Sequence, residues 1–483
     1  MKLNIGLFNE SFPPTIDGVS NAVVNYATYI TKNHADCTVV TPRYPHVTDD
    51  YPFEVYRYSS ADISKNLGYR VGNFISVKML RDLNAKHFDI IHVHSPFASS
   101  LIADELKKLN AGIPVVFTYH TKFDIDFQKR LKIRSLCSMA EKFICRNISK
   151  ADEVWVVSEG AAQSLRNIGY KGAYRVMKNG TDFARGRASD SEISEVRAQC
   201  GVDSDTRMLL FVGRMMWYKN TGLILDALSS LPNNINYKMV FVGDGLDKDA
   251  IKQYAIKLGL ADKTYFAGAI HDREKLRAYY SAADLFLFPS TYDTAGLVVT
   301  EAAACDLPSV LIDGSCAAED VVDDFSGFLC NENPHSLAEK IEYALSDSER
   351  LKRIGKNAGE SVYLSWEEAV ARAYKRYCEI YNEYHKNGVK KSLIQKVMPS
   401  NIKNNITNTA NRSRDTAAEQ LRRVSNAGRT AIGGVKNTAG QIQSRAKSVA
   451  DELKNGVKRA ASKAFAPSEI KRKIYIHDKE KKQ

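Results

Sequence analysis

The segment with the clearest chemical pattern spans residues 289–320, PSTYDTAGLVVTEAAACDLPSVLIDGSCAAED. An apolar, strand-like run ends where this segment starts, a turn with Gly296 follows, and a helix-forming run begins after the glycine. At such a helix start, unpaired backbone N–H groups and the positive end of the helix dipole point to one place, which suits an anion. We therefore expect phosphate oxygens to bind the amides of Gly296, Leu297 and Val298.

Two carboxylates flank this predicted phosphate site. Asp293 precedes the glycine turn, and Glu301 lies in the helix-forming run eight positions later. Carboxylates beside an anion would repel it unless they accept hydrogen bonds from hydroxyl groups. Sugar and ribose hydroxyls are natural donors of that kind, so the segment predicts a ligand with phosphate and sugar parts.

This arrangement resembles that of the retaining glycosyltransferases of family 4, which have the GT-B fold and carry two acids separated by seven residues. The resemblance implies that Asp293 contacts hydroxyls of the donor sugar and that Glu301 holds the nucleotide ribose. The first acid of the family is normally Glu, and here it is Asp, which is one methylene shorter. We expect this difference to affect which sugar is preferred more than which reaction is catalysed.

A second segment, FVGRMMWYKN at 211–220, has Arg214 and Lys219 where the family places a basic pair on the donor diphosphate. No metal is expected, so fixed cations must neutralise the leaving nucleoside diphosphate, and each charge-assisted bond contributes roughly 1.5 to 3 kcal/mol. Arg214 can bind phosphate through two parallel bonds, while Lys219 acts as a point charge. The resemblance thus implies catalytic roles for both cations and no cofactor, the nucleotide sugar being a co-substrate.

The N-terminal part of the chain supplies two further candidates. Gly18, in NESFPPTIDGVSNAVVNYA (9–27), lies between a strand-like and a helix-like run, where backbone can approach a phosphate closely. The family has its acceptor-side glycine loop at this position. His120, in TYHTKFDIDF (118–127), follows a strand and resembles the histidine loop of lipid-directed members. The resemblance implies that His120 lines the reaction centre near the transferred sugar.

Short β-branched runs alternate with helical patterns through the first 385 residues, and the pattern restarts after a polar stretch near 182–206. Near-continuous apolar strands predict parallel sheets with helices on both faces. We therefore predict an α/β fold with two Rossmann-like, doubly wound domains that face a cleft, as in the GT-B fold. The predicted parts are an acceptor domain at 1–182, a nucleotide-sugar domain at 183–364, a closing helix at 365–385 and a tail at 386–483.

The composition of the predicted tail differs from that of the rest of the chain. Residues 386–483 contain 23 Lys and Arg against 7 Asp and Glu, whereas the preceding residues carry a net charge of −4. Small apolar residues recur at gaps of three and four from Leu421 to Ala461. This pattern predicts a basic amphipathic helix on an anionic membrane surface, with a solvated or disordered tail as the alternative. Nucleic acid is disfavoured because stacking aromatic residues are scarce there.

Three further features of the sequence indicate where in the cell the protein is located. The eight cysteines are scattered and include no CxxC pair, and no run of 18 or more apolar residues occurs. The N-terminal segment MKLNIGLFNESFPP is too short and too polar for a signal peptide. We expect a cytoplasmic protein that is peripheral on the inner face of the membrane.

Together these features predict a retaining, metal-independent hexosyltransferase of glycolipid biosynthesis. The predicted donor is a nucleotide diphosphate sugar, with a UDP-sugar favoured, and the predicted acceptor is a membrane lipid such as diacylglycerol. The resemblance implies front-face attack, in which the departing phosphate helps to deprotonate the acceptor. Three alternatives stay open: an enzyme that acts on a soluble or polymeric glycan, a nucleotide-sugar epimerase on the same fold, and an inactive membrane-binding scaffold.

Overall fold

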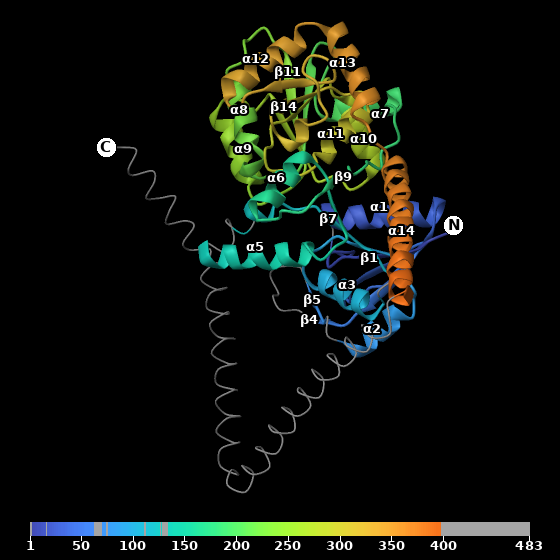
Figure 1. The fold of residues 1–483 in the computed structure, drawn as a ribbon. Helices are drawn as coiled ribbons and strands as arrows, with labels where there is room; N and C mark the ends of the chain where they lie inside the picture. The colour runs from blue at the N-terminus through green and yellow to red at the C-terminus, as the bar shows by residue number, and fades with distance from the viewer. Residues whose placement is uncertain are drawn as a thin grey trace. The chain divides into compact units, whose positions relative to one another are not determined.

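The computed structural model describes residues 2–15, 17–61, 70–73, 76–110, 113–125, 127 and 134–397 (Figure 1). Within them, two parallel sheets alternate with helices, which confirms the predicted α/β fold with two Rossmann-like domains. We call the parts built on the first and second sheets the N-terminal and C-terminal lobes. The predicted amphipathic helix of the tail lies outside the described residues.

The sheet of the N-terminal lobe has seven strands in the order β3-β2-β1-β6-β7-β8-β9, and neighbouring strands are parallel. Its strands are β1 (Asn4–Phe8), β2 (Asp36–Pro42), β3 (Glu54–Tyr58), β6 (Ile90–Val93), β7 (Val115–Tyr119), β8 (Glu153–Val156) and β9 (Arg175–Val176). A small antiparallel pair joins β4 (Ser60–Ala61) to β5 (Val71–Gly72). The helices are α1 (Gly18–Asn33), α2 (Val77–Asn84), α3 (Ala98–Leu109), α5 (Arg134–Ile148) and α6 (Glu159–Asn167).

Successive residues of each strand pack on opposite faces of this sheet, as the pleat requires. Phe8 and Ile91 belong to a buried cluster with side chains of α2, α3 and α5. Their neighbours Leu7 and Ile90 belong to a second cluster, which contains side chains of α1 and of the last helix of the lobe. Helices on both faces bury the central strands β6 and β7 completely and β1 almost completely, and this explains why these strand sequences are apolar without alternation.

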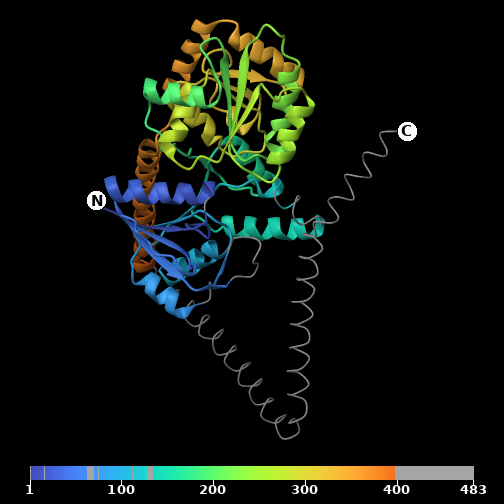
Figure 2. The same cartoon turned by 180° about the vertical axis from the view of Figure 1, so that it is seen from behind.

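The sheet of the C-terminal lobe has six parallel strands in the order β12-β11-β10-β13-β14-β15, with helices on both faces (Figure 2). Its strands are β10 (Arg207–Val212), β11 (Tyr237–Val242), β12 (Thr264–Gly268), β13 (Leu285–Phe288), β14 (Ser309–Ile312) and β15 (Phe328–Cys330). Its helices are α7 (Asp190–Gln199), η1 (Trp217–Lys219), α8 (Thr221–Ser229), α9 (Lys248–Lys257), α10 (Arg273–Ala282), α11 (Leu297–Ala304), η2 (Cys316–Ala318), α12 (Pro334–Leu345) and α13 (Ser348–Ser361).

The last helix, α14 (Trp366–Val397), follows the C-terminal lobe in sequence and packs on the N-terminal lobe (Figure 1). It continues past residue 385, where the sequence predicted the closing helix to end. The chain leaves and re-enters the N-terminal lobe through two adjacent segments, in which the amide of Thr181 donates to the carbonyl of Leu364 at 2.8 Å. A Cβ on Gly180 would lie 2.4 Å from the backbone nitrogen of Trp366, so only glycine allows this approach. In the described part of the chain we find no helix long and apolar enough to cross a bilayer.

A buried hydrogen bond ties α14 to the sheet beneath it. The hydroxyl of Tyr377 lies 2.6 Å from Nδ1 of His92 on β6, and both side chains are fully buried. At the helix surface, the guanidinium of Arg376 pairs with Glu153 of β8 at 2.5 Å. These contacts, together with the packing of Trp366, attach the C-terminal end of the globular part to the N-terminal lobe.

We predict that Tyr377→Phe destabilises the protein by about 1–3 kcal/mol, because it leaves the buried Nδ1 of His92 without its partner. The expected fall in the midpoint of thermal unfolding is roughly 2–4 °C per kcal/mol, measured by calorimetry. Tyr381→Phe, at a partly exposed position of the same helix, is the control and leaves the midpoint unchanged. Equal midpoints for all three proteins would contradict a stabilising role for the bond.

Candidate active site

Loops that follow the parallel strands of both lobes line one cavity with a volume of about 760 Å³. This is the place where ligands bind in doubly wound sheets. Most of the residues predicted for the site lie in its wall: Gly18, His120, Arg214, Lys219, Asp293, Gly296, Leu297 and Val298. The structure therefore brings eight of the nine predicted residues together, and only Glu301 lies behind the wall.

The start of α11 forms one side of the cavity. Gly296 has φ 56° and ψ 41°, a left-handed conformation that favours glycine, and a Cβ there would lie 2.8 Å from the Cα of Ala317. Among the residues that the structure describes, no side chain caps this helix start, so its first N–H groups have no capping acceptor there. Gly296, Leu297 and Val298 line the cavity, and the positive end of the helix dipole is directed into it.

Arg214 and Lys219 follow β10, whose neighbour in the sheet is β13, the strand that leads to α11. Arg214 is exposed in the cavity, and its guanidinium carbon lies 5.8 Å from the ring centre of Tyr218. Lys219 is only 5% exposed, and its Nζ lies 2.5 Å from Oδ1 of Asp293. The order of the strands thus brings together cations and a carboxylate that are far apart in the sequence.

Burial lowers the pKa of Lys219, and the carboxylate of Asp293 opposes this shift. The aromatic rings of Tyr218, Phe288 and Tyr292 lie between 5.7 and 5.9 Å from Nζ, and their faces attract the ammonium. The second oxygen of Asp293, Oδ2, is buried and has no hydrogen-bond partner among the described residues. Asp293 therefore holds Lys219 with one oxygen and keeps an unused acceptor on the other.

In the N-terminal lobe, Gly18 is the first residue of α1, and Asp17 caps that helix by accepting from the amides of Val19 and Ser20 at 2.9 and 2.8 Å. Within the described part of the chain, a Cβ on Gly18 would have no atom within 4 Å. The α1 start therefore differs from that of α11, because a carboxylate already occupies its amides. Gly18 contributes an open backbone surface to the cavity wall.

His120 directly follows β7 and is buried, with its Nε2 2.9 Å from Nδ1 of His94. Burial lowers the pKa of His120 to about 4, an effect that the carboxylate of Asp17 opposes. His120 is therefore a neutral imidazole at physiological pH. It lies in the cavity wall, as predicted, although its role there remains a prediction.

Glu301 lies in α11, but its carboxylate points into the lobe rather than into the cavity wall. Its two oxygens accept from Arg273 and from the hydroxyl of Tyr280, each at 2.7 Å, and both partners belong to α10. Burial raises the pKa of Glu301, and the guanidinium of Arg273 opposes the shift. Each oxygen retains a second lone pair, so the predicted ribose contact stays a prediction.

The sequence analysis did not single out Lys122 and Asn179, which also line the cavity. Lys122, two positions after His120, donates to the carbonyl of Thr291 in the C-terminal lobe at 3.2 Å. Oδ1 of Asn179 is buried and has no hydrogen-bond partner among the described residues. Both residues occur in loops after strands, and that position is the signal that could have identified them.

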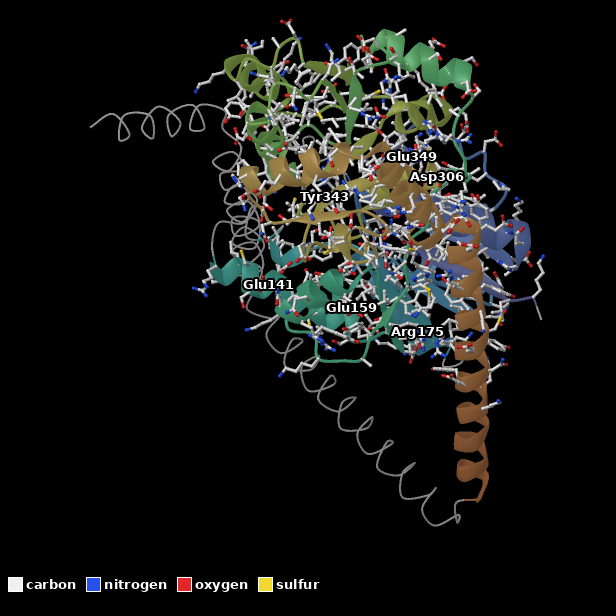
Figure 3. All side chains as sticks on the ribbon, turned by 90° about the horizontal axis from the view of Figure 1, so that it is seen from above. Glu141, Glu159, Arg175, Asp306, Tyr343 and Glu349 are labelled. Carbon is white, nitrogen blue, oxygen red and sulfur yellow. The ribbon has the colours of Figure 1, made fainter. Side chains whose placement is uncertain are left out.

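A further contact between the lobes lies beside the cavity, where Glu319 caps α6. Its oxygens accept from the amides of Glu159 (labelled in Figure 3) and Gly160 at 2.8 and 2.6 Å. Next to this cap, the hydroxyl of Ser158 donates to the carbonyl of Thr294, in the loop before α11, at 2.5 Å. The Ser158 bond couples the N-terminal lobe to the loop that carries Asp293, and the Glu319 bonds couple it to the segment after η2.

Family comparisons agree with this architecture. Residues 16–185 match the family model described as Glycosyltransferase Family 4, and residues 192–361 match the model described as Glycosyl transferases group 1. The first match begins after β1, and the two matches together contain all the other strands of both sheets.

Related proteins and a solved structure point the same way. The chain is 28% identical over 355 residues to alpha-monoglucosyldiacylglycerol synthase of Streptococcus pneumoniae, covering 71% of this chain and 78% of that protein. It is 23% identical over 392 residues to the protein of the same name from Acholeplasma laidlawii, covering 78% and 96%. The fold is similar to that of HepE of Anabaena, solved with UDP and glucose, with a TM-score of 0.61 and 20% identity over 78% of this chain and 100% of that one.

The chain has two lobes, each built on a parallel sheet, and a cavity at the carboxyl ends of their strands. Family models match both lobes, and these findings lead to one conclusion. The chain belongs to family 4 of the glycosyltransferases and is a glycosyltransferase with the GT-B fold.

Proposed function

We propose that the protein transfers a hexose from a nucleotide diphosphate sugar, with UDP as the favoured nucleotide, to a membrane lipid such as diacylglycerol. The observation that carries this proposal is the convergence of Arg214, Lys219 and the first amides of α11 on one cavity. The printed names of the two related synthases support diacylglycerol as the acceptor. The UDP complex of HepE supports UDP as the nucleotide.

In the proposed reaction, the bond between the anomeric carbon of the sugar and the diphosphate breaks, and negative charge grows on the β-phosphate. Arg214, Lys219 and the uncapped amides of α11 stabilise this charge more in the transition state than in the ground state. The cavity wall carries Lys122, Arg214 and Lys219 against Asp17 and Asp293, which is a net positive balance suited to a diphosphate. In this proposal these fixed cations neutralise the negative charge of the diphosphate, and no metal is required.

Asp293 has two tasks in this proposal. Oδ1 holds the ammonium of Lys219 at 2.5 Å, and the unpartnered Oδ2 accepts a hydrogen bond from a hydroxyl of the donor sugar. A carboxylate engaged with an ammonium is a poor covalent nucleophile, because its charge is already neutralised. We therefore propose front-face attack with retention, in which the departing phosphate takes the proton of the acceptor hydroxyl.

The proposed location is the inner face of the cytoplasmic membrane, where the protein is peripheral. The basic composition of residues 386–483 supports this part of the proposal, because clustered Lys and Arg are attracted to anionic lipid head groups. A protein held there would meet a lipid acceptor without leaving the surface.

The direct test incubates the purified protein with UDP-glucose, UDP-galactose or GDP-mannose and with diacylglycerol vesicles, in the presence of EDTA. We expect a glycosyl-diacylglycerol from a UDP-sugar, with the α-configuration of the donor retained in the anomeric proton coupling, and undiminished activity in EDTA. Transfer only to an added glycan, release of an epimerised sugar without acceptor, or no turnover would each contradict the proposed acceptor chemistry.

We predict that Arg214→Ala lowers kcat/KM for the donor by about 10²–10³, because one fixed charge at the leaving group is lost. Arg214→Lys keeps a cation but loses the paired N–H geometry, so we expect its kcat/KM to lie between those of the wild type and Arg214→Ala. Lys252→Ala is the matched control, since it removes an exposed cation from α9 of the same lobe. Initial rates of donor consumption check the series, and equal rates for Arg214→Ala and the control would contradict the proposed role.

We predict that truncation after residue 397 abolishes sedimentation with anionic vesicles, because it removes most of the basic tail. The full chain is expected to sediment with anionic but not with neutral vesicles, and less so at high salt. The truncated protein should still transfer sugar to short-chain diacylglycerol in detergent micelles, which separates anchoring from chemistry. Undiminished sedimentation of the truncated protein would contradict the proposed role of the tail in membrane binding.

A further inference from the structure

Two histidines meet at the edge of the N-terminal sheet that faces the cavity. His94 directly follows β6 and His120 directly follows β7, and these two strands are neighbours. Nδ1 of His94 lies 2.9 Å from Nε2 of His120, and the rings are stacked at 5.2 Å with an angle of 22° between their planes. His94 is 3% exposed and does not line the cavity, whereas His120 is 8% exposed and does.

The unused nitrogen of His94 decides which ring donates. A neutral imidazole has one N–H donor and one acceptor, so a hydrogen bond between two rings needs the donor on one and the acceptor on the other. Nε2 of His94 is buried and has no hydrogen-bond partner among the described residues. A proton on that atom would leave a buried N–H orphaned, which is rarer and costlier in proteins than an unused acceptor. The proton of His94 therefore belongs on Nδ1, which donates to Nε2 of His120.

We propose that His94 is a positioning residue that fixes His120 in the tautomer protonated at Nδ1. Because Nε2 accepts from His94, it cannot also take a proton from a substrate. His120 then presents to the cavity an N–H donor, which suits an oxygen of the sugar or of the phosphate, and it is not a general base. This inference rests on the proposed function for the identity of that oxygen, but the tautomer itself does not depend on it.

The neutrality of both rings supports the assignment. Burial lowers the pKa of His120 to about 4, and burial with the neighbouring rings of His92 and His120 lowers the pKa of His94. A second proton on His120 would have to bind Nε2, where it would face the N–H of His94 across 2.9 Å and break the bond. The stacked pair is thus compatible with one shared hydrogen-bond proton and no net charge.

His92 provides an internal comparison. It lies two positions before His94, is fully buried, and has both ring nitrogens engaged, with Thr118 and Tyr377, each at 2.6 Å. Its hydrogen bonds stabilise the packing of α14 on the sheet and do not include His120. Substitution of His92 therefore disturbs the same buried region without removing the donor to His120.

The first test reads the tautomer directly. In full-length protein labelled with ¹⁵N-histidine, two-bond nitrogen–proton spectra distinguish the two neutral tautomers, and the loss of signals in His120→Gln assigns those of His120. We expect the Nδ1–H tautomer in the wild type and in His92→Leu, and a mixture of tautomers in His94→Leu. The Nε2–H tautomer in the wild type, or an unchanged His120 pattern in His94→Leu, would overturn the proposal.

The second test measures transfer from UDP-glucose to diacylglycerol in micelles. We expect His94→Leu to lower kcat about tenfold, the effect of one lost hydrogen bond, with KM for UDP-glucose changed less than about twofold. His94→Asn should restore most of kcat, because its amide nitrogen can donate from the position of Nδ1. His92→Leu should lower the thermal midpoint but retain kcat.

Equal losses of kcat in His92→Leu and His94→Leu, or no rescue by His94→Asn, would reduce His94 to a structural role and overturn the proposal. If wild-type protein transfers no sugar to diacylglycerol, the proposed function fails, while the tautomer spectra still decide the inference.

Discussion

The ion pair between Lys219 and Asp293 is the interaction on which the rest of the site depends. Removing an ammonium from water is costly, and a partner at 2.5 Å together with three ring faces offsets that cost. The pair fixes the loop after β10 against the loop after β13, and α11 begins from the second of these loops. One buried contact therefore sets the positions of both the cation and the helix amides that face the cavity.

Two glycines let the backbone approach closely enough for this arrangement. Gly296 allows the start of α11 to lie against Ala317, and Gly180 allows the two segments that connect the lobes to run side by side. A side chain at either position would displace backbone rather than a flexible group, because the nearest atoms include backbone atoms at 2.8 and 2.4 Å. The first glycine thus shapes the start of α11 in the cavity wall, and the second shapes the connection between the lobes.

The sequence predicts the groups that follow strands, because the carboxyl ends of parallel strands converge whatever the details of packing. That rule brings Gly18, His120, Arg214 and the α11 amides to one cavity. It does not predict partners that come from other elements of the fold. The sequence predicts that Glu301 binds a ligand, but it does not predict that Arg273 and Tyr280 of α10 donate to its two oxygens. Such pairings depend on the packing of helices, which no local spacing encodes.

The same physical cause gives opposite results at two residues of the cavity wall. Burial lowers the pKa of both Lys219 and His120. Lys219 begins from an ordinary pKa far above neutrality and has a carboxylate as its neighbour, so it remains a cation. His120 begins near neutrality and has another imidazole, His94, as its hydrogen-bond partner, so it becomes neutral. In the proposed reaction, this difference concentrates positive charge where the leaving phosphate gains negative charge, and it leaves at His120 a neutral donor that does not compete for the diphosphate.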